Sequence, residues 1–89
     1  MESLIEILQK EKECLDEIRH CERNIMINER HLNKIQEYGS DCEAYHKDVK
    51  HCESEINIWL SKKEMHERLL ETYRATIKQY LIDKIKLDV

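Results

Sequence analysis

The chain has 89 residues, 38% of them charged and 40% hydrophobic, with one glycine, no proline and a net charge of -4. A chain of this size forms one domain with a small core, so an elongated fold needs a partner to complete it. The scarcity of turn formers excludes sheet-rich folds and indicates long helices. The mild acidic excess argues against a nucleic-acid partner. No apolar run exceeds three residues, so we expect no membrane span and a cytoplasmic location.

The first half of the chain carries a heptad pattern that predicts a helix over residues 2–38. Eight of the ten a and d positions between Leu4 and Ile35 are apolar, which is typical of a helix-packing seam. The a positions are Leu4, Glu11, Ile18, Ile25 and Leu32, and the d positions are Ile7, Cys14, Cys21, Asn28 and Ile35.

The pattern breaks at "EYGSDCE" and resumes in a second helix predicted over residues 41–87. Gly39 suits a helix C-terminal cap, and Ser40 with Glu43 forms a capping box for the next helix. A turn this short makes the two helices antiparallel neighbours in an all-α hairpin. A second capping box at Ser61 leaves open a three-helix arrangement with a break there.

The antiparallel register predicts which seam residues meet. Cys21 should face Trp59, Asn28 should face Cys52, and Ile25 should face Ile56. The expected hairpin seam comprises Ile18, Cys21, Ile25, Asn28, Cys52, Ile56 and Trp59.

An internal repeat, "IRHCERNIMI" at residues 18–27 and "VKHCESEINI" at residues 49–58, keeps the same heptad positions in both copies. Its cysteines fall in the seam and its histidines, His20 and His51, at outward c positions. A two-fold relation between the copies would pass near Ile25 and Ile56. Duplication and a shared heptad rule both explain the similarity.

All four cysteines lie at a or d positions, so we expect reduced thiols that pack in the core. Cys42 and His46 are spaced as two metal ligands, but the facing helix offers no second pair. Cys14 opposite His66 is a formal nucleophile and base without an oxyanion loop. We therefore predict a protein that is not an enzyme, with no cofactor and no metal-binding residues.

The apolar stripes are wider than one helix pair needs, and the second helix outruns the first. Residues 80–89 form an apolar overhang, for which we expect a contact with another protein. The candidate partner-binding residues there are Tyr80, Leu81, Ile82, Ile85, Leu87 and Val89. Further leucines at e and g positions predict a homodimer that forms a four-helix bundle. They are Leu8, Leu15, Leu60, Leu69 and Leu81.

These features predict a protein-protein interaction module, a small helical adaptor, regulator or inhibitor that self-associates and binds a larger protein. One alternative is a secreted substrate, because the hairpin is similar to the WXG family with W-x-G at its turn. The chain departs from that family's pattern at two positions. Tyr38 directly precedes Gly39, where the family has a tryptophan two residues before the glycine. Tyr80 is followed four residues later by Lys84 instead of an acidic residue. Another alternative is a nucleic-acid-binding accessory protein that uses the basic residues Arg74, Lys78, Lys84 and Lys86.

Overall fold

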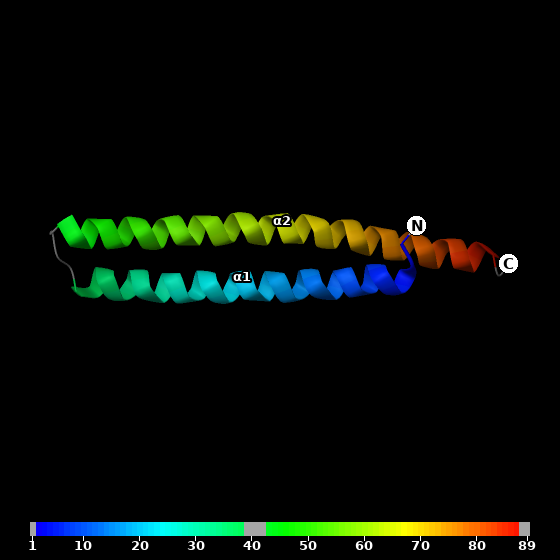
Figure 1. The fold of residues 1–89 in the computed structure, drawn as a ribbon, viewed down its shortest axis with the longest axis horizontal. Helices are drawn as coiled ribbons and strands as arrows, with labels where there is room; N and C mark the ends of the chain where they lie inside the picture. Colours follow the sequence, from blue (N-terminus) through cyan, green and yellow to red (C-terminus); the bar gives the residue numbers. More distant parts are fainter. Residues whose placement is uncertain (1, 39–42, 88–89) are drawn as a thin grey trace.

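The computed structural model describes residues 2–38 and 43–87, with side chains for 2–37 and 43–86, and forms an antiparallel helical hairpin (Figure 1). Helix α1 spans Leu4–Tyr38 and helix α2 spans Glu43–Leu87. The hairpin measures 71 × 17 × 16 Å. The predicted all-α hairpin is confirmed.

Helix α1 begins at Leu4, two residues later than the sequence pattern suggested, because Ser3 caps it. The Glu6 backbone N–H donates to the Ser3 Oγ at 3.2 Å, and the Ile7 N–H donates to the Ser3 carbonyl at 3.1 Å. This is the geometry of an N-cap residue, which satisfies backbone donors that lack helical partners. The S-x-x-E pattern of residues 3–6 is the sequence signal for this start.

Helix α2 runs without interruption through Ser61, so the three-helix alternative is wrong. Lys63 occupies a seam position close to Ser61. Its Nζ forms an ion pair with Glu22 Oε1 on α1 at 3.8 Å. The predicted caps at Gly39 and Ser40, and Cys42 of the candidate metal pair, lie outside the described residues.

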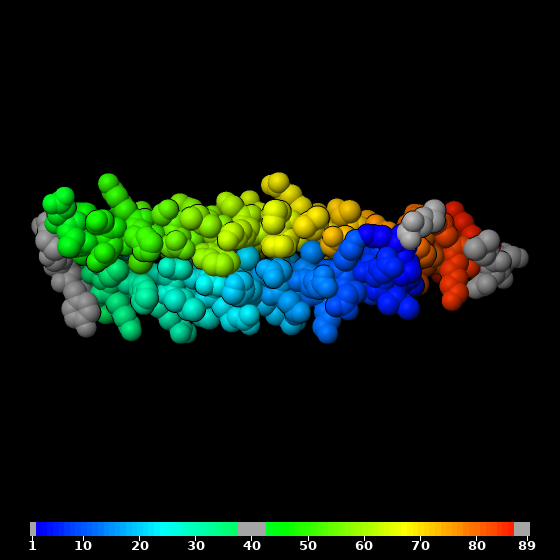
Figure 2. Space-filling model, viewed as in Figure 1, coloured from blue at the N-terminus to red at the C-terminus, as the bar shows by residue number. Residues whose placement is uncertain are grey.

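Contacts between the helices define the antiparallel register. Glu11 pairs with Arg74 at 3.3 Å and Glu22 with Lys63, so residue numbers fall along α2 as they rise along α1. The two helices pack closely along their common length, while the last turns of α2 extend beyond the start of α1 (Figure 2).

Burial follows the predicted heptad but is complete at few positions. The a and d side chains from Leu4 to Ile35 and from Tyr45 to Ile77 are all buried or half-buried. Cys14, Ile18 and Leu70 form the buried cluster, with Leu15 and Tyr73 packed against it. Among the described residues, the buried hydrophobic side chains are Ile7, Cys14, Ile18, Cys21, Cys52 and Leu70, and of these Cys21 is fully buried.

Loss of the Ser3 hydroxyl should destabilise the hairpin. We expect Ser3→Ala to lower the free energy of unfolding by about 1 kcal/mol because the Glu6 N–H loses its acceptor. Ser3→Asp should keep most of the stability. Chemical denaturation measures both, with Ser54→Ala inside α2 as the control. Equal stability of Ser3→Ala and the native chain would contradict the cap.

Candidate interaction surfaces

The seam divides the outer surface of the hairpin into two flanks. A groove of about 350 Å³ is lined by Lys10, Glu13 and Glu17 of α1 together with Leu69 of α2. These residues occupy c and g positions, so the c and g positions of both helices lie on one side of the seam. We call this side the opposite flank, because it lies across the seam from the flank that carries most of the leucines. The b and e positions share the other side, which we call the leucine flank after Leu8, Leu15, Leu60 and Leu81.

The opposite flank carries an aromatic contact next to the seam. The His20 ring meets the Trp59 ring edge-on, with centroids 5.3 Å apart, and Lys62 Nζ lies 4.4 Å from the Trp59 ring centroid. The expectation that His20 points away from the seam was therefore incomplete. Trp59 is only half-buried, and its large ring reaches the side chains that border the seam.

The leucine flank exposes apolar side chains at e positions of both helices. Leu8, Leu60 and Leu81 are all exposed, and Leu15 is half-buried against the core cluster. Three further exposed residues lie at b positions of this flank. They are Ile85, which was predicted as a partner-binding residue, and Ile5 and Met26, which were not predicted.

Leu69 does not belong to the surface predicted for it. It lies on the opposite flank, because a g position and an e position lie on different sides of the seam. Leu69 therefore lies apart from the other four leucines of the predicted dimer face, which share one flank. Exposed Met65 lies one helical turn from Leu69, on the same opposite flank.

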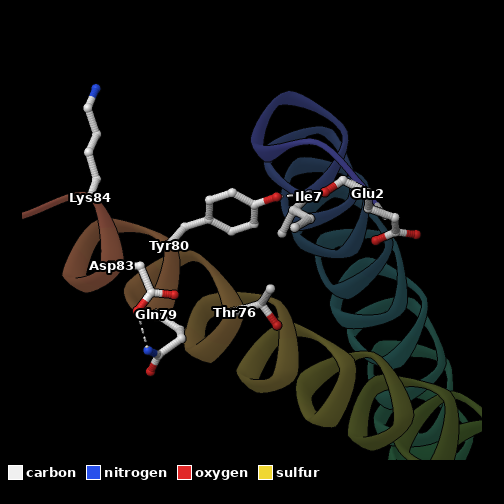
Figure 3. A pocket seen from close by; sticks show the side chains of 7 residues that line it. All are labelled: Glu2, Ile7, Thr76, Gln79, Tyr80, Asp83 and Lys84. Carbon is white, nitrogen blue, oxygen red and sulfur yellow. Dashed lines mark hydrogen bonds between the residues drawn. The ribbon is translucent and has the colours of Figure 1, made fainter. Parts of the chain in front are cut away.

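The end of α2 differs from the prediction at Tyr80. Its hydroxyl donates a 2.9 Å hydrogen bond to the Glu2 carbonyl, because the residues before α1 cross toward α2 (Figure 3). Tyr80 therefore has a partner within the hairpin. A groove of about 610 Å³ lies here, bounded by Ile7, Tyr80 and Thr76, with Lys84 extending away from it.

Of the remaining overhang residues, Leu81, Ile82 and Ile85 lie beyond the start of α1. Leu81 is 51% exposed and Ile85 is 66% exposed, while Ile82 is half-buried. The side chain of Leu87 and the whole of Val89 lie outside the described residues. The helix end thus presents apolar surface that α1 does not cover.

The predicted seam residues all lie along the contact of the two helices. Ile18, Cys21 and Cys52 are buried, whereas Ile25, Asn28, Ile56 and Trp59 are half-buried. The Asn28 amide is accommodated locally, since its Nδ2 donates to the Asn24 carbonyl at 2.9 Å.

The described cysteines, Cys14, Cys21 and Cys52, are free and buried. Burial raises the pKa of the Cys14 thiol, and the nearby carboxylates of Glu13 and Glu17 raise it further. Burial likewise raises the pKa of the Cys21 thiol. Both groups favour the neutral thiol, which is a poor nucleophile and a poor metal ligand. Among the described residues, no cluster of three or more His, Cys, Asp or Glu side chains could hold a metal ion.

His66 is the one described side chain with a buried polar atom that lacks a hydrogen-bond partner. It lies in the seam beside Cys14, and its Nδ1 is the unpaired atom. A buried polar atom without a partner destabilises the folded state.

Comparison with known proteins gives no relative from which a function could be transferred. No protein-family model, no curated protein and no solved structure matches the chain significantly. Neither helix, over the residues that the structure describes, is long and apolar enough to cross a membrane.

We expect His66→Leu to stabilise the hairpin by about 1 to 2 kcal/mol at neutral pH, because it removes the unpaired Nδ1 and adds apolar contact. Chemical denaturation measures the gain. His51→Leu at an exposed site is the control and should change stability by less than about 0.5 kcal/mol. A loss of stability in His66→Leu would show that the imidazole has a favourable role.

The raised thiol pKa values predict a loss of stability at alkaline pH. The stabilisation is present below the ordinary thiol pKa and disappears as the pH rises through the higher pKa of the folded state. We expect the free energy of unfolding to fall between about pH 8 and pH 10. The Cys14→Ala/Cys21→Ala variant should show a flatter dependence, and an unchanged slope would contradict the assignment.

Proposed function

We propose that the chain is a non-enzymatic interaction module, a small helical adaptor, regulator or inhibitor that self-associates and binds a larger protein. The observation that carries this proposal is the apolar surface that remains outside the seam. Exposed apolar side chains lie on both flanks of the hairpin, and those of the leucine flank continue onto the end of α2.

The arrangement of the exposed side chains supports the proposal. Single exposed apolar residues are normal on a protein surface, whereas a row at heptad spacing is the pattern that helices use to pack on other helices. Leu8 and Leu15 are two helical turns apart on α1, and Leu60 and Leu81 occupy the same heptad position on α2. Such a row fits a helical partner surface.

The end of α2 is the proposed contact with a larger protein. Among the described side chains of α2, Ile85 is the most exposed large hydrophobic residue, and it lies beyond the groove bounded by Ile7 and Tyr80. An exposed helix end beside an apolar groove offers both a projecting side chain and a recess to a partner.

An affinity pull-down from the native source tests the larger-protein contact. We expect the immobilised native chain to retain a stoichiometric partner and Ile85→Glu to lose it, because a charge replaces the exposed apolar contact. Ile27→Glu is the matched control, since Ile27 is also exposed but lies on the opposite flank. Circular dichroism should show both variants equally helical.

If the native chain retains no partner, or if Ile85→Glu retains it as fully as Ile27→Glu does, the proposed contact at the end of α2 is wrong. Self-association is measured separately below, so the two parts of the proposal can fail independently.

A further inference from the structure

On the leucine flank of α2, the order of leucines and charges along one copy of the helix matches the order along a second, antiparallel copy. Acidic residues occupy the half nearer the turn, basic residues occupy the half nearer the C-terminus, and a leucine ends each half. In chain order these residues are Leu60, Glu64, Glu67, Arg74, Lys78 and Leu81. Two antiparallel copies of this surface would place Leu60 on Leu81, Glu64 on Lys78 and Glu67 on Arg74, each pair occurring twice.

The leucine flank of α1 has its own centre of symmetry at nearly the same level of the hairpin. Leu8 and Leu15 lie on either side of residues 11–12, and the α2 pattern is centred near Leu70 and Glu71. The structure places these centres within about one helical turn of each other, because Glu11 pairs with Arg74, three residues beyond Glu71, and Leu15 packs against the cluster that contains Leu70. One two-fold axis can therefore pass close to the centres of symmetry of both helices.

We infer that the leucine flank binds a second copy of this chain, with the two hairpins antiparallel and the two-fold axis crossing the flank near Lys12 and Glu71. Helix α1 packs on α1 of the second copy, and α2 packs on α2. This inference rests on the self-association in the proposed function and adds the occupant, the orientation and the paired residues.

The alternative bundle aligns both turns at one end and packs α1 on α2 of the second copy. It brings Lys12 close to Glu71 and Arg19 close to Glu64, but it leaves the leucines facing charges. Since the two copies would lie at equal levels, Leu8 would face Arg74 and Leu15 would face Glu67.

Leucine burial decides between the two bundles. Solvent-exposed ion pairs contribute little to stability, whereas apolar surface removed from water contributes substantially. The antiparallel bundle brings like charges together only at Lys12 and at Glu71. Both occupy b positions at the rim, where water screens their repulsion.

Three of the four charges paired by this interface are free of ion pairs within the described part of the hairpin. In the ranges 2–37 and 43–86, Glu64, Glu67 and Lys78 form no ion pair, whereas Arg74 is paired with Glu11. The interface also covers part of the overhang, because Leu81 lies on Leu60 of the second copy. Leu81 is 51% exposed in the single hairpin, and the second copy would cover it.

Sedimentation equilibrium tests whether a second copy of the chain binds the leucine flank. The native chain should have twice the 10.8 kDa chain mass, and Leu60→Glu and Leu81→Glu should each weaken the dimer by about tenfold or more. Met65→Glu is the control, since Met65 is equally exposed on the opposite flank, and it should leave the dimer unchanged. A monomeric native chain, or equal weakening by Met65→Glu, would overturn the inference.

A charge exchange tests the orientation. Glu64→Lys and Lys78→Glu should each weaken the dimer, and the double variant should recover native affinity because the pair is restored across the two-fold axis. In the alternative bundle these residues do not face each other, so the double variant would remain weak. That result would overturn the antiparallel arrangement while leaving self-association intact.

A distance measurement gives the orientation directly. Spin labels introduced through a non-natural amino acid at exposed Arg30 should lie on the order of 55 Å apart in the antiparallel dimer. Separation within about three helix diameters, roughly 30 Å, would instead show that both turns lie at one end.

Discussion

The packing of α1 against α2 along a single seam is the constraint on which the rest of the structure depends. Two helices cover each other on one side only, so any apolar stripe wider than the seam stays in contact with water. Among the residues that the structure describes, the seam buries six hydrophobic side chains, while Leu8, Leu60 and Leu81 beside it remain exposed. The hairpin therefore has a small core and an apolar flank on the same two helices.

The seam also contains polar residues that limit what it can contribute alone. Lys63 is accommodated by an ion pair with Glu22, and the Asn28 amide by the Asn24 carbonyl. His66 keeps an unpaired buried nitrogen. Such positions favour one register at some cost in stability, as polar a and d residues do in coiled coils. A second layer of apolar packing on the leucine flank would compensate for this cost.

Much of the fold could be predicted from the sequence because heptad spacing and a single helix break are local signals. The seam residues from Ile18 to Trp59 follow directly from that spacing. Three features could not be predicted in this way. Tyr80 bonds to the backbone of residues before α1, and the Trp59 ring reaches His20 beside the seam. Leu69 was grouped with leucines on the other side of the seam because width alone does not distinguish e from g.

Prediction of the interaction surface therefore requires the three-dimensional register of the two helices as well as the sequence pattern. Once Glu11 is placed beside Arg74, the centres of the symmetric leucines of α1 and of the reversed charge pattern of α2 fall within about one helical turn of each other. The coincidence of the two patterns near one two-fold axis favours an isologous interface.

Small-angle X-ray scattering in solution tests this account most directly, because it reports mass and length together. The antiparallel dimer has twice the 10.8 kDa chain mass and a maximum dimension on the order of 85 Å, since the two turn-proximal ends project in opposite directions. The single hairpin is 71 Å long, and a dimer with both turns at one end would keep that length. A monomeric mass, or a dimer no longer than the hairpin, would contradict the account.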